Sequence, residues 1–307
     1  MTLLSKEAVD EARSTSARPS SPKPRVRLSA ATAGNRPGKL GYAFLVIVML
    51  AAIYPIYWSF MIASGDKSTI TRREALSLPG PNFIDNALSV INNPTVNFWS
   101  SVLASVIVST IVAVSVVFFS TLAGYAFSKL RFGGRDALLY FVIGTLAVPT
   151  QLAVVPLFIV MVNLRLVGTL PSVILPALVS AFGVFWMTQY LRQALPFELI
   201  EAARMDGASM FRTFWSIALP AARPAAAMLS LFIFIQTWTN FFWPYIALKG
   251  STTVTLPVAL STLSNNYFDD YSLILSGVIL SILPLLALFL VAGRQLVKGI
   301  MEGAVKG

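Results

Sequence analysis

The chain has no cysteine and no histidine among its 307 residues. It can therefore form no disulfide, and it lacks a thiol nucleophile, an imidazole acid or base and the usual zinc ligands. Charged residues are also scarce, at 12% of the chain, against about 25% in soluble domains. These absences argue against a water-soluble globule and against most enzymes. We expect no catalytic residue, no metal site and no cofactor in this chain.

Hydrophobic residues are abundant instead, at 56% of the chain. Six apolar stretches carry no Asp, Glu, Lys or Arg, and each is long enough to cross a membrane as a helix. They cover residues 41–63, 97–128, 137–163, 170–191, 224–248 and 271–293. The pattern predicts an all-α integral membrane fold with six transmembrane helices. Residues 1–39 read as a disordered tail, which leaves residues 40–307 as the transmembrane domain.

The basic residues predict the orientation of these helices. Lys67, Arg72, Arg73, Arg165 and Lys249 lie in loops on one side, and the remainder of the 23 Lys and Arg lie on the other. Because cytoplasmic loops are enriched in basic residues, both termini are expected in the cytoplasm. The net charge of +10 is accounted for in the same way, and we expect no nucleic-acid partner.

A charged, glycine-broken segment, residues 196–220, separates the fourth and fifth stretches. Pro196 suits the first turn of a helix, where its missing amide hydrogen has no intrahelical partner. Gly207 is expected to end that helix, because glycine adopts a left-handed backbone without a Cβ penalty. A second short helix should run from about Ser209 to Leu219.

Pro220 is expected to separate this second helix from the fifth membrane span. The segment thus predicts a helix–turn–helix at the cytoplasmic membrane surface. Its many apolar side chains suit a groove on another protein, and they suit a connector lying among lipid headgroups about as well.

Short motifs in this segment and elsewhere resemble those of ABC importer permeases. The segment itself contains "EAA" (201–203), "DGA" (206–208) and "IALP" (217–220). Three further stretches are similar to the carbohydrate-uptake branch, specifically to its maltose-type second permease subunit. They are "GYAFSKLRFGGRD" (124–136), "TWTNFFWPYIAL" (237–248) and "KGIMEGAVKG" (298–307). The resemblance covers residues 40–307, and it identifies them as a permease domain.

In that family the loop docks into a cleft on a cytoplasmic ATPase. The resemblance implies that Glu201 orients the loop through charge or a hydrogen bond and that Gly207 makes the turn. The implied ATPase-coupling residues are Glu201, Ala202, Ala203, Asp206, Gly207, Leu219 and Pro220.

The resemblance also implies partners and a location. We expect two cytoplasmic ABC ATPase subunits, a second permease subunit on a different chain, an extracytoplasmic solute-binding protein and surrounding membrane lipid. The sequence contains no Walker-type glycine–lysine loop, so ATP and Mg²⁺ are expected on the partner ATPase. The implied location is the cytoplasmic (plasma) membrane of a bacterium or archaeon.

The fifth apolar stretch contains candidate substrate-path residues. Gln236, Asn240 and Trp243 recur at helical spacing and would share one face of a continuous helix. Amides beside aromatic rings suit sugars, although interhelical hydrogen bonds and an interfacial aromatic belt explain the same residues.

The two remaining segments are assigned through the resemblance. In maltose-type relatives, the outer loop before the last span helps to dislodge sugar from the binding protein. Here that loop would offer Asn265, Asn266, Tyr267 and Asp269, and an ordinary solvated loop is the alternative. The basic, glycine-rich C-terminus would reach between the ATPase subunits, or would simply fray and snorkel its lysines.

Our first hypothesis is an ABC importer permease that moves a sugar or sugar-like solute from a binding protein into the cytoplasm. The second is an ion-coupled secondary carrier of a polar solute. Such carriers place ionisable groups within the membrane, and the six stretches contain none. A membrane-embedded enzyme would lack catalytic groups, and a purely structural subunit would leave the charged segment unexplained.

Overall fold

The computed structural model describes residues 38–66, 78–264 and 270–304, and all regular structure in these ranges is helical. The chain divides into two compact units, residues 1–54 and 55–307, with the division inside α2. The longer helices are α2 (Lys39–Ala63), α3 (Phe83–Ile91), α4 (Phe98–Lys129), α5 (Arg135–Gly144), α6 (Val154–Asn163), α8 (Ala181–Ala194), α9 (Phe197–Met205), α11 (Leu219–Trp238) and α14 (Tyr271–Ala304). The shorter ones are α7 (Pro171–Ile174), α10 (Met210–Thr213), α12 (Phe242–Ala247) and α13 (Leu256–Ser261).

Five helical segments in the described ranges are long and apolar enough to cross a membrane, and a bent pair makes a sixth. The five are Lys39–Ala63, Phe98–Lys129, Pro171–Ala194, Met210–Trp238 and Tyr271–Val291. The predicted all-α fold with several membrane helices is therefore confirmed.

The third predicted span, residues 137–163, is not one straight helix. It forms two helical pieces, Arg135–Ala147 and Thr150–Asn163, at 91° to each other. The break falls at Val148, which is extended (φ −83°, ψ 119°) just before Pro149. Proline disfavours helical geometry in the preceding residue and donates no amide hydrogen, so the helix ends there.

The fifth span begins earlier than predicted. Helical structure runs from Met210 to Trp238 without interruption, so the expected break at Pro220 was wrong. A π-helical turn covers Phe214–Ala218, in which the Leu219 amide bonds the Phe214 carbonyl. This wider turn directly precedes Pro220, whose ring would clash with a carbonyl of the preceding turn in a regular α-helix.

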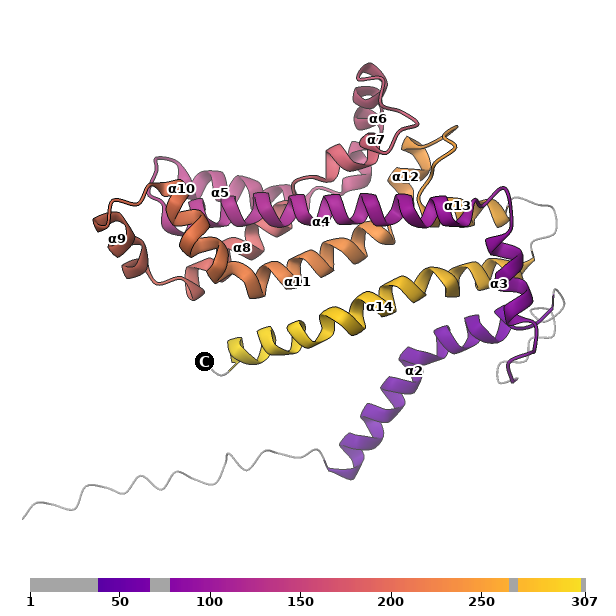
Figure 1. Cartoon of the computed structure of the whole chain (residues 1–307). Coiled ribbons are helices and arrows are strands. Elements are labelled where there is room, and N and C mark those ends of the chain that lie inside the picture. The colour runs from indigo at the N-terminus through magenta and orange to yellow at the C-terminus, as the bar shows by residue number, and fades with distance from the viewer. Residues whose placement is uncertain (1–37, 67–77, 265–269, 305–307) are drawn as a thin grey trace, which may run out of the picture. The chain divides into compact units, whose positions relative to one another are not determined.

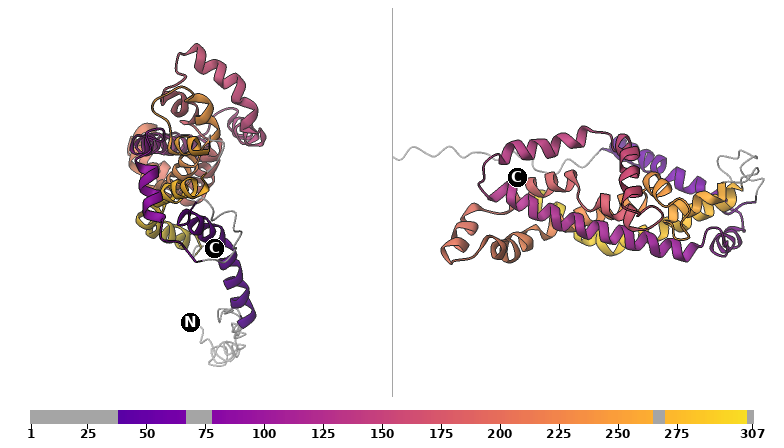
Figure 2. Two further views of the ribbon diagram at one scale, coloured as in Figure 1. Left: turned by 90° about the vertical axis from the view of Figure 1, so that its right-hand side faces the viewer. Right: turned by 90° about the horizontal axis from the view of Figure 1, so that it is seen from above.

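The core of the second unit is built around α4, which packs against α8 and α11. α4 extends from the end that carries α9 and α10 to the end that carries α3 and α13, as Figure 1 and the right-hand view of Figure 2 show. Small residues allow the close approach of α4 and α8. A Cβ atom on Gly124 would lie 2.8 Å from the Met187 backbone, and one on Gly183 would lie 2.3 Å from the Ser120 hydroxyl. Close backbone contact of this kind is a main source of helix association in membranes.

Gly124→Ala is therefore expected to destabilise the bundle. The added methyl group must displace Met187, and overpacking of this kind costs about 1–3 kcal/mol. Gly144→Ala is the matched control, because a Cβ there meets nothing within 4 Å and alanine is the better helix former. Thermal unfolding in detergent should show a lower midpoint for Gly124→Ala and an unchanged or higher one for Gly144→Ala. Equal shifts in both variants would contradict this packing.

Hydrogen bonds between distant segments stabilise the end of the second unit that carries α12 and α13. The Leu256 amide at the start of α13 donates to the Ser105 hydroxyl of α4 at 2.7 Å. The Gly168 amide donates to the Ala247 carbonyl of α12 at 2.8 Å. The linkers around α12 and α13 are thereby held against α4 and the α6–α7 connection.

Candidate functional site

The predicted helix–turn–helix is present, and its turn has a Schellman geometry. α9 ends at Met205, and Gly207 adopts a left-handed backbone with φ +75°. The Gly207 amide bonds the Arg204 carbonyl at 3.0 Å, and the Ala208 amide bonds the Ala203 carbonyl at 2.9 Å. These two bonds satisfy carbonyl groups that the end of a helix leaves free. The prediction that Gly207 makes the turn is confirmed.

The second helix of the motif begins where the sequence indicates. Ser209 is the N-cap of α10, and its hydroxyl accepts a hydrogen bond from the Arg212 amide at 3.3 Å. From there the chain continues through the π-helical turn into α11. The turn is thus joined to a membrane helix by continuous helical structure.

One face of the motif is built into the core of the bundle. Ile200 and Phe214 are 0% and 1% exposed. The Phe214 ring lies 6.0 Å from the Tyr125 ring and 6.3 Å from the Phe118 ring, both on α4. Burying a side chain of this size stabilises a fold by about 1.5–3 kcal/mol. The motif is therefore a rigid projection from α4 and α11.

The motif also leaves large apolar side chains exposed near its turn. Met205, Met210 and Phe211 are 88%, 59% and 73% exposed; we refer to these three residues as the apolar cap. They lie in sequence on both sides of the turn at Gly207. Exposed apolar surface placed on a rigid support is typical of a protein-binding surface.

The loop between α4 and α5 contacts the start of α9. The centroid of the Phe197 ring lies 5.9 Å from Lys129 Nζ and 5.5 Å from Arg131 Cζ. Both pairs are cation–π interactions. Lys129 Nζ also donates to the Arg192 carbonyl at 3.3 Å. These contacts tie α9 to the end of α4, a role beyond the membrane orientation that the sequence predicts for the basic residues of this loop.

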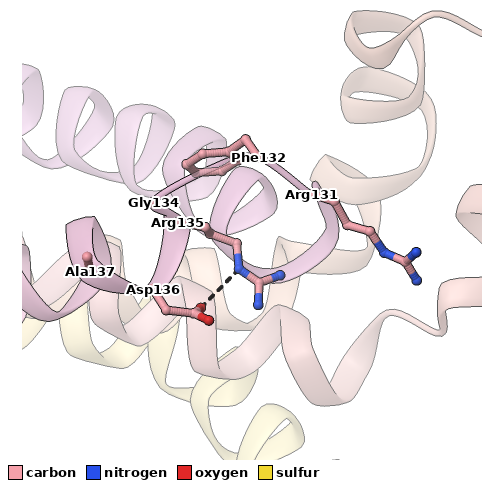
Figure 3. A pocket seen from close by; sticks show the side chains of 6 residues that line it. All are labelled: Arg131, Phe132, Gly134, Arg135, Asp136 and Ala137. Atoms are coloured by element: carbon pink, nitrogen blue, oxygen red, sulfur yellow. Dashed lines mark hydrogen bonds and ion pairs between the residues drawn. The ribbon is translucent and has the colours of Figure 1, made fainter.

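The rest of the α4–α5 loop surrounds a shallow cavity of about 470 Å³. Figure 3 shows Arg135 and Asp136 side by side, while Arg131 extends from the other side of the loop. Arg135 Nε and Asp136 Oδ1 are 3.0 Å apart. Arg135 is partly buried and Asp136 is exposed, so this surface pair contributes little to stability.

The structure brings only part of the predicted coupling set together. Four of these residues are exposed at or near the turn: Glu201, Ala202, Asp206 and Gly207. Ala203, at 9% exposed, faces the core. Leu219 and Pro220 are half-buried in the first turn of α11, beyond the π-helical turn. They belong to the membrane helix and do not form part of the exposed turn.

Gln236, Asn240 and Trp243 do not share a helix face, contrary to expectation. α11 ends at Trp238, and a new helix, α12, starts at Phe242. Pro244 explains the break, because in a continuous helix it could not bond the Asn240 carbonyl, whereas in the first turn of α12 its missing donor costs nothing. The Trp243 indole N–H donates to the Ser172 carbonyl at 3.1 Å, which is an interhelical structural contact. Gln236 and Asn240 are exposed.

The expected binding-protein contacts, Asn265, Asn266, Tyr267 and Asp269, lie outside the described residues. The last predicted span is part of α14, which continues as helix to Ala304. The proposed role of the C-terminus stays a prediction.

A protein-family model matches residues 116–300. Its description is "binding-protein-dependent transport system inner membrane component". The match covers more than half of the chain, and it includes the helix–turn–helix together with α8, α11 and the second half of α4. The chain belongs to this family.

Several relatives of this chain are named as permease proteins. The chain is 33% identical over 271 residues to an arabinooligosaccharides transport system permease protein of Halalkalibacterium halodurans, with 87% of this chain and 95% of the relative covered. It is 32% identical over 273 residues to a lactose transport system permease protein of Rhizobium radiobacter, with 88% and 97% covered. The membrane location and the transporter class follow from this family membership.

A solved structure shares the fold. It is a bacterial ABC transporter involved in the import of the acidic polysaccharide alginate, with a TM-score of 0.69 and 24% identity, covering 83% of this chain and 94% of the other. None of these comparisons supports the second hypothesis, an ion-coupled secondary carrier.

The residues that sequence reasoning missed are the anchors of the motif. In the sequence, Ile200 and Phe214 are two of many apolar residues in the segment, and no pattern in so short a segment separates buried from exposed members. Phe197 and Lys129 were likewise unpredicted as a pair, because their contact joins residues far apart in the sequence.

Proposed function

We propose that this permease is the membrane-embedded subunit of an ATP-driven importer and that residues 196–220 couple it to a cytoplasmic ATPase. ATP and Mg²⁺ bind to the ATPase, of which two copies associate with a pair of permeases. The partner permease is a different chain, and a solute-binding protein delivers solute from the extracytoplasmic side. Both termini and the helix–turn–helix face the cytoplasm of a bacterium or archaeon.

The observation that carries this proposal is the two-sided construction of the helix–turn–helix. Ile200 and Phe214 are buried in the bundle, and the apolar cap is left exposed. A connector that merely lay on lipid would need no such rigid support. A ligand-driven partner can shift the bundle only if its contacts differ between states, and a rigid projection transmits such a difference.

The proposed solute is a sugar or a sugar-like molecule. Relatives that match nearly the full chain are named as permease proteins for arabinooligosaccharides and for lactose. The exposed amides Gln236 and Asn240 remain candidates for contact with the passing solute. The indole N–H of Trp243 is instead used in a hydrogen bond to the Ser172 carbonyl, which is a structural contact.

Co-purification tests this proposed function. The tagged full-length chain, expressed from its own genomic neighbourhood and extracted in mild detergent, should retain an ATP-binding subunit and a second permease. The reconstituted complex should hydrolyse ATP and take up labelled sugar only when the binding protein is supplied. Uptake that follows an ion gradient and needs no ATP would overturn the proposal.

A further inference from the structure

A cavity of about 790 Å³ lies at the end of the second unit opposite the helix–turn–helix. Its walls come from the segment between α3 and α4, from α6, and from α12, α13 and their linker. This volume falls within the range of roughly 300–1,000 Å³ that small-molecule sites occupy. The coupling mechanism proposed above makes no use of this cavity.

The wall of the cavity combines an aromatic ring with hydroxyl groups. The Tyr245 ring stacks on the Phe241 ring at 5.1 Å, which fixes its orientation. Ser101 and Thr262 also line the cavity, and both donate their hydroxyl hydrogens to backbone carbonyls, of Val96 at 3.1 Å and of Ala259 at 2.7 Å. Their oxygen atoms keep lone pairs that can accept hydrogen bonds from a polyhydroxylated ligand.

Asn97 adds an amide to this wall from an unusual backbone conformation. Its φ of +43° and ψ of +55° are left-handed, a region that asparagine tolerates better than most residues with a Cβ. Within the described part of the chain its side chain makes no hydrogen bond, not even the N-cap bond that α4 would offer. The amide is therefore free to donate to, or accept from, a bound molecule.

Lys249 is the one charged residue among those that line the cavity. It forms no ion pair with any part of the chain that the structure describes. The described lining residues thus present a cation, hydroxyl and amide groups and a stacking ring, and none of them is a carboxylate. An ammonium group in this setting favours an anionic substituent on the ligand.

We propose that this cavity binds a sugar or polyol that carries an anionic group, a carboxylate or a phosphate. Lys249 contacts the anion, Tyr245 covers the apolar face of the ring, and Asn97, Ser101 and Thr262 contact hydroxyl groups. The cavity would hold solute at the extracytoplasmic mouth of the permease before translocation. This inference rests on the proposed function, which it narrows to a preference among solutes.

Ligand-detected saturation-transfer NMR on the full-length chain tests the proposal directly. The protein is held in lipid nanodiscs with the subunits that co-purify with it, and no binding protein is added. The probes are D-glucose, D-glucuronate and glucose 6-phosphate, which share one ring and separate a neutral sugar from a carboxylate and a phosphate. We expect both anions, or one of them, to bind about tenfold more tightly than glucose, with the preference falling as NaCl is raised.

Lys249→Met should abolish this preference by weakening anion binding about tenfold, while glucose binding stays within about twofold. Arg165→Met is the matched control, because Arg165 lies in a loop predicted on the same side and does not line the cavity. Both replacements keep a side chain that is unbranched at Cβ. The backbone strain at Arg165, which has a positive φ, is therefore the same in the wild type and in Arg165→Met.

Three binding results would overturn the inference, and so would one uptake result. The binding results are equal binding of glucose and the anions, undiminished anion binding in Lys249→Met, and loss of anion preference in Arg165→Met as well. A Lys249→Met variant that loses only binding-protein-dependent uptake would likewise reject a solute site and would assign Lys249 to the binding protein. None of these outcomes affects ATP-driven uptake by the wild-type complex, so failure here is distinct from failure of the proposed function.

Discussion

Gly207→Val is expected to lower ATP-dependent uptake and sugar-stimulated ATPase activity by about tenfold or more. Gly207 has a φ of +75°, a conformation that costs a residue with a Cβ about 1–2 kcal/mol and a β-branched one more. The turn must then give up its two Schellman hydrogen bonds or carry this strain. In the first case the apolar cap shifts relative to α11, and in the second the strain disfavours the conformation that docks. A cost of about 1.4 kcal/mol corresponds to a tenfold change in an equilibrium.

Two controls separate coupling from general damage. Gly207→Asn should keep most of the activity, since asparagine tolerates the left-handed region. Gly168→Val imposes a similar strain at a φ of +81°, where a Cβ has open space, but it lies outside the helix–turn–helix and should leave ATPase stimulation near the wild-type value. Wild-type uptake and ATPase stimulation in Gly207→Val would refute the coupling role of this turn.

Phe211→Asp is expected to detach the ATPase while leaving the permease folded. Phe211 is 73% exposed, so a carboxylate there is solvated in the free subunit and costs little stability. In a complex the same carboxylate would be buried without a partner. Removal of a central aromatic contact from an interface costs about 2 kcal/mol or more, which weakens binding roughly thirtyfold. Quantitative co-purification with the ATPase and the unfolding temperature measure the two effects.

Phe132→Asp provides the comparison for this variant. Phe132 is also an exposed phenylalanine, at 42%, and it lies in the α4–α5 loop close to Arg131 and Arg135 (Figure 3). A carboxylate at position 132 would lie beside two arginines and outside the apolar cap. Binding of the ATPase should therefore change by less than about threefold, which corresponds to about 0.6 kcal/mol. If both variants lose the ATPase equally, the apolar cap has no special role.

The sequence predicts the helical membrane fold well because long uncharged stretches have few other solutions. It predicts the turn at Gly207 for a similarly local reason, since the chain needs a left-handed residue where the helix ends. The errors arise at individual prolines, whose effects differ from one another. Pro149 breaks its span, Pro220 is accommodated beside a π-helical turn, and Pro244 starts a new helix.

Sequence periodicity could not separate these three cases, because the outcome for each proline depends on the hydrogen bonds of the surrounding backbone. The same limit applies to the candidate sites. The inward side of the helix–turn–helix depends on contacts of Phe214 with α4, which lies far away in the sequence. The cavity beside Lys249 draws its walls from three regions of the chain, and its existence follows only from their packing.

The central claim is that the apolar cap faces the cytoplasm and meets the ATPase there. The chain contains no cysteine, so Phe211→Cys introduces a single thiol. A membrane-impermeant maleimide should label this thiol in inside-out vesicles and not in right-side-out vesicles, and the co-expressed ATPase should protect it from labelling. Labelling from the extracytoplasmic side alone, or labelling unaffected by the ATPase, would contradict the account.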